Sequence, residues 1–282
     1  MSPDAYAVRL GADRGLIEFR HMLVSVPEMT WTVLINIAFI TVLFFQRDSR
    51  IEGTSLAALT LPSILGMLVA QGGFMGVAGK LATDREDGTL LRARAVPNGV
   101  FGYLVSQLTL ATIVTVFNIA IIFIAGLLLL DGVAPDGVGD WLTLLWVIAL
   151  GLLATVPLGA IAGGLVKSAA SSFGLTFLSI SVLIAISGIF YPITGLPGWL
   201  QGIGQVFPIY WLGLGMRSAL LDDAAAAAEL GGGWRTVETA VVLAVWAVVG
   251  MFLALGVLRR MARGESGSVV EARRERALQR GY

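Results

Sequence analysis

The sequence contains no cysteine, a single histidine and only two lysines among its 282 residues. Without cysteine the chain can form no disulfide, offers no thiol nucleophile and cannot bind a metal through sulfur. His21 alone cannot build a histidine cluster, and we interpret it as an exposed residue at a membrane interface. We therefore expect no metal site. An enzyme within the membrane would need a nucleophile with a base or a pair of carboxylates, and Ser179, Ser181 and Ser187 have no base nearby in the sequence. We therefore expect no catalytic residue, and the chain is not predicted to be an enzyme.

Charge is also scarce. Charged residues make up 13% of the chain, hydrophobic residues make up 56%, and the mean hydropathy is +0.84. Soluble domains carry about 25% charged residues, so this composition predicts a membrane protein, and its long apolar runs make it an all-α one. A spanning helix needs about 20 apolar residues. Six segments are predicted to span: 30–45, 57–79, 99–130, 141–166, 173–190 and 237–258.

The number of spans depends on the distribution of charge. Residues 168–216 carry no formal charge and are long enough to cross twice. Cytoplasmic loops of membrane proteins carry an excess of Lys and Arg. Six spans with both termini in the cytoplasm place fifteen basic residues inside and four outside, whereas a seventh span would export the seven arginines of the tail. We therefore predict one crossing here, giving three domains: 1–29 (cytoplasmic tail and interfacial helix), 30–258 (six-span domain) and 259–282 (basic cytoplasmic tail).

The rest of the uncharged region, residues 191–217, is broken into short pieces by prolines and glycines. Its aromatic side chains are of the kind that gathers at the boundary between lipid and water. Irregular backbone survives at membrane depth only where it is buried in protein or lines a cavity. We predict a pair of short re-entrant helices in the outer leaflet.

The segment 11–29 is predicted to form an amphipathic helix. Its polar face consists of Arg14, Glu18, His21, Ser25 and Glu28. Its apolar stripe consists of Leu16, Phe19, Leu23 and Val26. Because the segment carries several charges and joins the first span directly, we expect it to lie along the cytoplasmic interface rather than to cross. The alternative is a soluble helix that packs on a partner.

The interiors of the predicted spans contain no Asp, Glu, Lys, Arg or His. Proton-coupled carriers usually place such residues near the middle of the membrane, so this absence argues against that class. GFMGVAGK, residues 73–80, has one residue too many between its glycines for a phosphate-binding loop and lacks the Ser or Thr that should follow the lysine. If ATP drives this protein, a separate chain must hydrolyse it.

Small residues are frequent where the predicted spans should pack. They are Gly72, Gly76 and Gly79, Gly159, Gly163 and Gly164, and Ala247, Gly250 and Ala254. Such residues permit close approach of helices. The sequence leaves open whether they form a sliding or dimerising face or serve general packing.

The segment KLATDREDGTLLRARAVP, residues 80–97, places seven charges between two long uncharged runs. The second span is predicted to continue into the cytosol and to stop at Gly88, which suits a helix C-cap. A short second helix, capped by Thr89, is then predicted to end at Pro97. It would present an apolar ridge to a groove on another protein. The alternative is a solvated loop whose charges only fix the topology.

Two motifs carry a family resemblance. DREDGTLLRARAVP, residues 84–97, resembles the cytoplasmic segment between the second and third spans of ABC-2 permeases, the membrane subunits of ATP-binding-cassette (ABC) exporters. SGIFYPITGLPGWLQGIGQVFPIYWLGLGMR, residues 187–217, resembles the block that follows their fifth span. The chain departs from the usual pattern at Asp84, Leu91 and Val96. With the six spans and the amphipathic helix, the resemblance covers nearly the whole chain and favours exporters of the daunorubicin-resistance type.

The resemblance implies a permease in the cytoplasmic membrane of a bacterium that moves a hydrophobic or amphipathic compound, such as a drug, an antibiotic or a lipid-like molecule, out of the cell. Two permeases, identical or related, would work with two cytosolic ATPase subunits. The ATPase would bind ATP and Mg²⁺, so we expect no cofactor in this chain. Membrane lipid and a small amphipathic substrate are the other expected partners, and nucleic acid is not one.

The resemblance also implies the residues of three sites. ATPase coupling is assigned to Asp84, Arg85, Glu86, Asp87, Gly88, Thr89, Leu90, Leu91, Arg94 and Pro97. The interfacial helix contributes Arg14, Glu18, Phe19 and His21. A substrate path or outer gate is assigned to Phe190, Tyr191, Pro192, Pro197, Trp199, Pro208, Tyr210, Trp211 and Arg217.

Two other functions stay open. A permease for polysaccharide or glycolipid would share the architecture but would need a wide channel lined by aromatic residues. An ATP-independent carrier would have no ATPase partner, so co-purification of such a partner separates it from a permease.

Overall fold

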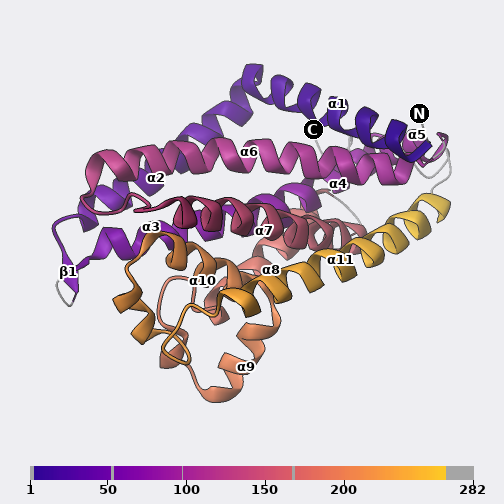
Figure 1. The fold of residues 1–282 in the computed structure, drawn as a ribbon. Helices are drawn as coiled ribbons and strands as arrows, with labels where there is room; N and C mark the ends of the chain where they lie inside the picture. Colours follow the sequence, from indigo (N-terminus) through magenta and orange to yellow (C-terminus); the bar gives the residue numbers. More distant parts are fainter. Residues whose placement is uncertain (1–2, 52–53, 97, 167–168, 265–282) are drawn as a thin grey trace.

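Helices account for nearly all of the chain in the computed structural model, which describes residues 3–51, 54–96, 98–166 and 169–264 (Figure 1). The first half contains α1 (Pro3–Val24), α2 (Val26–Gln46), α3 (Leu56–Gln71), a π-helical turn η1 (Gly72–Gly76), α4 (Val77–Glu86), α5 (Thr89–Arg94) and α6 (Gly99–Leu129). The second half contains α7 (Val138–Leu165), α8 (Ala169–Ile186), η2 (Ile193–Gly195), α9 (Gly198–Val206), α10 (Pro208–Leu220), η3 (Asp223–Ala228) and α11 (Thr236–Gly264). The two-residue strands β1 (Arg50–Ile51) and β2 (Thr54–Ser55) form one antiparallel pair.

Within the described ranges, five helical segments are long and apolar enough to cross a membrane. They are Val26–Gln46, Leu56–Glu86, Gly99–Leu129, Val138–Leu165 and Thr236–Met261. Each overlaps one of the predicted spans, so these five predictions are confirmed as apolar helices. The remaining predicted span, 173–190, corresponds to α8, whose apolar part Gly174–Ile186 falls short of that length among the described residues. Five candidate spans define a multi-pass membrane protein.

The helix α3 lies at the centre of the bundle. In the apolar 18-residue stretch of the helical segment Leu56–Glu86, which begins with α3, 72% of the residues are buried, compared with 11% in that of α2. No charged residue occurs between Leu56 and Gly79, and a helix that is apolar on every side suits either lipid or the interior of a bundle. The packing of α6, α7 and α10 on α3 places it in the interior. Leu61, Leu65 and Leu212 are fully buried in the core that α3 shares with α6, α7 and α10.

The π-helical turn η1 interrupts this central helix where α7 approaches it most closely. A side chain at Gly159 of α7 would collide with the backbone carbonyl oxygens of Gly73 and Phe74, and a side chain at Gly73 would meet the hydroxyl of Thr155. Gly159 and Gly73 therefore permit backbone-to-backbone packing of α7 on η1. Two of the predicted packing residues behave differently, because a Cβ at Gly76 or Gly79 would meet nothing within 4 Å.

The ends of α4, α7 and α11 meet at one end of the bundle. Arg85 donates a hydrogen bond from Nη1 to the carbonyl oxygen of Val166 over 2.6 Å, directly after α7. A Cβ at Gly164 would contact Met261 near the end of α11. The N-terminus of α1 lies at the same end, where Asn98 donates a hydrogen bond to Asp4 over 2.7 Å. The β pair lies at the opposite end (Figure 1).

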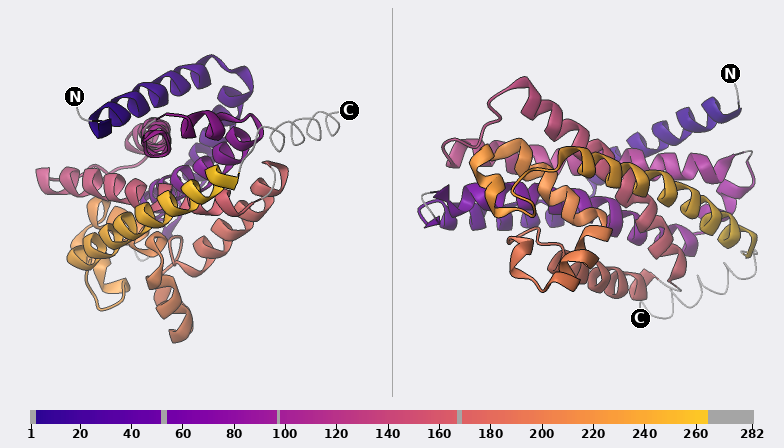
Figure 2. Two further views of the ribbon diagram at one scale, coloured as in Figure 1. Left: turned by 90° about the vertical axis from the view of Figure 1, so that its right-hand side faces the viewer. Right: turned by 60° about the horizontal axis from the view of Figure 1, so that its bottom comes forward.

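A pair of short helices, α9 and α10, follows α8, as predicted for residues 191–217. The break between them comes at Phe207, because Pro208 has no N–H to continue the first helix and suits the start of the second. α10 is buried between α3 and α7, whereas α9 projects from the bundle (Figure 2).

The predicted helix 11–29 is wrong in its bounds. α1 begins at Pro3 and ends at Val24, and Ser25 adopts an extended conformation with φ −80° and ψ 108°. Pro27 cannot donate the hydrogen bond that would continue α1 and instead occupies the first turn of α2. Glu28 therefore belongs to α2 and not to the polar face of α1.

Candidate functional site

An elbow of two helices at the α5 end of the bundle carries most of the predicted coupling residues. α4 ends at Glu86, and Gly88 adopts a left-handed conformation with φ +71° that residues other than glycine rarely adopt. α5 then runs from Thr89 to Arg94. The predicted helix–turn–helix is confirmed. Thr89 is not the N-cap, however, because Gly88 takes that position and the Thr89 hydroxyl accepts a hydrogen bond from Arg92 over 3.0 Å.

The apolar side of α5 faces the protein rather than solvent. Leu90 is 1% exposed and packs with Leu81, Tyr103 and Leu258. The predicted exposed ridge is therefore wrong at Leu90, since a six-residue helix can keep its place only by burying its apolar side chain. The exposed residues of the elbow include Asp87 and Arg92, while Glu86 is half-buried. The side chains of Leu91 and Arg94, and Pro97 as a whole, lie outside the described part of the structure.

Asp84 is buried at the centre of a polar network and cannot be a direct contact for another protein. The phenol of Tyr103 donates a hydrogen bond to its Oδ2 over 2.9 Å, and the Gln107 amide lies 3.5 Å from the same oxygen. Lys80 Nζ lies 3.5 Å from Oδ1, and Arg14 Nη2 lies 3.9 Å from Oδ2. One carboxylate thus joins α4 to both α1 and α6.

The same network continues through Glu18 on α1. Arg14 donates a hydrogen bond from Nε to Glu18 over 2.9 Å, and Lys80 forms an ion pair with Glu18 over 3.4 Å. The guanidinium of Arg14 also lies over the ring of Tyr103 at 5.7 Å, a cation–π contact. Arg14 and Glu18 therefore point toward the protein, and their side chains tie α1 to the central helix. The predicted polar face of α1 is an internal contact surface over this length.

α1 crosses α6 on the outside of the bundle (Figure 2). The close packing comes from Ala7, Gly11 and Gly15, spaced four residues apart along one side of α1. A Cβ at Gly15 would fall 2.8 Å from the Ser106 carbonyl oxygen. Phe19 completes this side with an edge-to-face contact to Phe117 at 6.1 Å between centroids. The spacing of small residues is a packing signal that the sequence analysis did not use.

Tyr103 and Gln107 were also missed. They are four residues apart, and therefore on one face of a helix, within a stretch from Ala95 to Leu130 that has no charge. A buried polar side chain needs a hydrogen-bonding partner, so this pair was a signal that a charged or polar group faces α6. The signal does not identify Asp84 as that group.

The predicted outer-gate residues divide into two sets. Phe190, Tyr191, Pro192, Pro197 and Trp199 are exposed. Pro208, Tyr210, Trp211 and Arg217 are buried in the layer that α10 forms against α3 and α7. Tyr210 and Trp211, which were assigned to the substrate path, therefore lie in the core and not on a surface.

Arg217 is held by a partner that sequence reasoning missed. Its Nε donates a hydrogen bond to Glu229 over 2.6 Å, and its Nη1 donates to the Ile189 carbonyl oxygen over 3.1 Å. Both ionised side chains are buried. The pair fixes the segment after η3 to α10 and to the end of α8. Arg235 reinforces this region by donating to Gln205 over 2.8 Å.

Residues 29–257 match a family model described as "ABC-2 family transporter protein", so the chain belongs to the ABC-2 family of membrane permeases. It is 24% identical over 212 residues to "Putative transport permease YvfS" of Bacillus subtilis (strain 168), and the aligned region covers 72% of this chain and 82% of that relative. The chain is thus the membrane permease component of an ABC-2 type transporter. In this family the permease typically lacks a nucleotide-binding site and the ATPase is separate.

Proposed function

We propose that this permease exports small hydrophobic or amphipathic compounds and that the elbow of α4 and α5 is its contact with the ATPase. The observation that carries the coupling role is the buried Asp84 carboxylate, which joins the elbow to α1 and α6. The export of a small compound is supported by the resemblance of residues 84–97 and 187–217 to drug and antibiotic exporters of the daunorubicin-resistance type.

In the proposed mechanism, ATP binding closes the two ATPase subunits and displaces α5. Gly88 transmits this displacement to α4. From α4 it passes through Asp84 to α1 and α6, and through the hydrogen bond from Arg85 to the end of α7. Packed helices respond to such a push as rigid bodies rather than by continuous deformation. Displacement of the elbow would therefore move four helices, α1, α4, α6 and α7.

We propose six crossings with both termini in the cytoplasm. α7 and α11 both run toward the α5 end of the bundle (Figure 1). The chain between them therefore has to run back to the opposite end, and α8 is the first part of this segment. Because the protein has no native cysteine, single cysteines test the topology. Asp223→Cys should react with an impermeant maleimide from outside the cell and Arg92→Cys only from inside. The reverse pattern would overturn the orientation.

In the assembled exporter two permeases, identical or related, stand over two ATPase subunits that bind ATP and Mg²⁺. The transporter lies in the cytoplasmic membrane of a bacterium. α9 and α10 then face the outer leaflet, and the exposed residues Phe190, Tyr191 and Trp199 are the proposed outer gate. Tyr210, Trp211 and Arg217 support this gate from behind, because they are buried.

The coupling role is tested by co-expressing the permease with its ATPase and purifying the complex in mild detergent. Asp87→Arg reverses an exposed charge on the elbow, and Asp131→Arg makes the same change at an exposed site at the other end of α6. We expect Asp87→Arg to reduce ATPase recovery and substrate-stimulated hydrolysis while Asp131→Arg leaves both unchanged. Equal behaviour of the two variants would show that the elbow is not the contact.

A further inference from the structure

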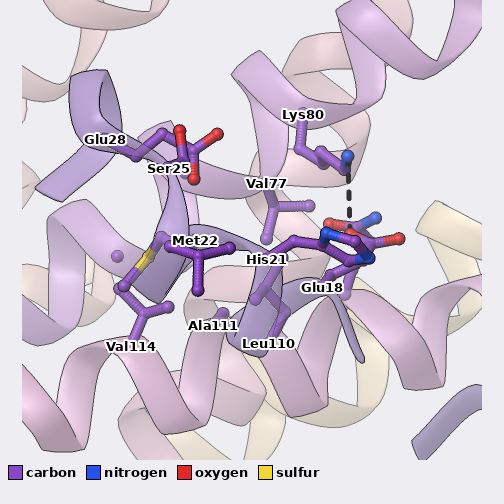
Figure 3. A pocket seen from close by; sticks show the side chains of 14 residues that line it. Glu18, His21, Met22, Ser25, Glu28, Val77, Lys80, Leu110, Ala111 and Val114 are labelled. Carbon is purple, nitrogen blue, oxygen red and sulfur yellow. Dashed lines mark ion pairs between the residues drawn. The ribbon is translucent and has the colours of Figure 1, made fainter. Parts of the chain in front are cut away.

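A cavity of about 640 Å³ opens between α1, the start of α2, η1 with α4, and α6 (Figure 3). Sites for small organic ligands typically measure about 300–1,000 Å³. This cavity lies within one chain and next to the Asp84 network, but neither the predicted coupling residues nor the predicted outer gate describe it. Its lining shows what class of compound it suits.

Most of the cavity wall is apolar. Its apolar lining comes from Met22 of α1, Val77 of α4, and Leu110, Ala111 and Val114 of α6 (Figure 3). A methionine is flexible and adapts to ligands of different shape. Ligand sites also need polar groups that fix the orientation of the ligand. At the rim of this cavity these are Glu18, His21, Ser25, Glu28 and Lys80.

The charges at the rim do not balance. Of the rim residues, Lys80 and Glu18 pair with one another and with Arg14 and Asp84, which do not line the cavity, at 2.9–3.5 Å. This leaves Glu28, whose side chain has no ion pair within the described residues. Figure 3 places it on the side of the cavity away from the Glu18–Lys80 pair. The surplus charge at the rim is therefore negative and lies beside an apolar wall.

We propose that this cavity binds an amphiphilic organic cation, with its apolar body against Met22, Leu110 and Val114 and its cationic group beside Glu28. The inference rests on the proposed export function, because it names the class of compound exported. The apolar body of such a cation gains from burial against the apolar lining, and its charge is attracted by the Glu28 carboxylate, which would repel an anion.

The location of the cavity connects binding to the elbow. Gly76 lines it, so the π-helical turn η1 forms part of its wall, and π-helical turns occur frequently at functional sites. Lys80, one turn further along the same helix, lines the cavity and pairs with Asp84. A bound ligand would thus contact the helix that carries the coupling network.

Binding of rhodamine 6G, a fluorescent lipophilic cation, tests the proposal by fluorescence anisotropy on the purified permease–ATPase complex without nucleotide. Because Glu28 is exposed, we expect Glu28→Gln to weaken binding about two- to five-fold, the range for an exposed ion pair. Gly76→Leu should abolish binding, because its side chain enters open space inside the cavity. Gly79→Leu is the matched control: it also enters open space, but Gly79 does not line the cavity. Nile red, an uncharged dye, should bind wild type and Glu28→Gln equally.

The proposal is overturned if wild type does not bind rhodamine 6G, if Gly76→Leu and Gly79→Leu behave alike, or if Glu28→Gln binds as wild type does. Glu28→Asp keeps the charge at the first turn of α2 and should retain most of the affinity. Unfolding midpoints of all variants separate loss of the site from loss of the fold. Failure here is distinguishable from failure of the proposed function, because ATPase recovery and basal hydrolysis are measured on the same complexes.

Discussion

The two ends of this permease each bury a carboxylate, but they hold it in different ways. Near α5, Asp84 shares four partners on three helices, most of them at 3.5 Å or more. In the α10 layer, Glu229 has one ionised partner, Arg217, at 2.6 Å, and both are buried. The first arrangement is a loose network and the second is a closed pair.

This difference bears on movement. A network with several partners can exchange contacts without leaving a charge unpaired, whereas a closed pair that separates leaves two buried charges without counter-ions. The α5 end is therefore suited to move when the ATPase moves, and the α10 layer is suited to stay fixed. The four predictions that follow test this contrast.

The largest effect is expected from Glu229→Gln. It leaves the Arg217 charge buried without a counter-ion, which should lower the free energy of unfolding by about 3–5 kcal/mol. The midpoint of thermal unfolding of the purified permease measures this loss. Asp222→Asn, at an exposed residue seven positions earlier, is the control and should change little. An unchanged midpoint for Glu229→Gln would show that the pair does not fix this layer.

Asp84→Asn should cost less than Glu229→Gln. Glu18 remains beside both Arg14 and Lys80, so the two cations keep a counter-ion, and the loss should be about 1.5–3 kcal/mol for the charged hydrogen bond removed. The coupling role adds a second readout, a fall in substrate-stimulated ATP hydrolysis. A stability loss as large as that of Glu229→Gln, with hydrolysis intact, would remove the contrast between the two ends.

Gly159→Ala tests the contact that connects the two ends through the middle of the bundle. The added methyl group would collide with the backbone of η1, and such overpacking typically costs about 1–3 kcal/mol. Gly256→Ala is the matched control, because a Cβ on α11 at that position meets nothing within 4 Å. If both variants unfold at the wild-type midpoint, α7 does not clamp the π-helical turn.

The smallest effect is expected between the ends, where Asn36 of α2 donates a hydrogen bond to Asn118 of α6 over 2.6 Å. A double-mutant cycle with Asn36→Ala and Asn118→Ala should give a coupling free energy of about 0.6 kcal/mol, the average for such bonds between membrane helices. A coupling free energy as large as the loss expected for Glu229→Gln would instead make α2 a fixed part of the bundle.

The spans and the elbow could be predicted from the sequence because length, hydropathy and a single glycine decide them. Five apolar runs became helices, four of them within four residues of their predicted bounds, while the second continues to Glu86. Gly88 adopts the left-handed conformation expected of a turn. The α8 region was harder to judge, since the apolar part of that helix is shorter than a span within the described residues.

The sequence did not predict which side chains are buried against neighbouring helices and which are exposed. Leu90 on a short helix fits an exposed ridge as well as a core contact, and aromatic residues such as Tyr210 and Trp211 suit a lipid boundary as well as a protein interior. Only packing of α5 on α6 and of α10 on α3 and α7 buries them. The pairing of Arg217 with Glu229 arises in the same way, from a return of the chain that no local pattern encodes.

The most direct test of the contrast between the two ends measures distances in the permease–ATPase complex. Spin labels at the exposed positions Arg92→Cys on α5 and Asp223→Cys on η3 are each paired with a label at Leu145→Cys on α7, with labelled permease diluted by unlabelled copies. Between the nucleotide-free and the ATP-bound complex, the distance from 92 to 145 should shift while the distance from 223 to 145 stays the same. A constant 92–145 distance together with a shifted 223–145 distance would contradict the account.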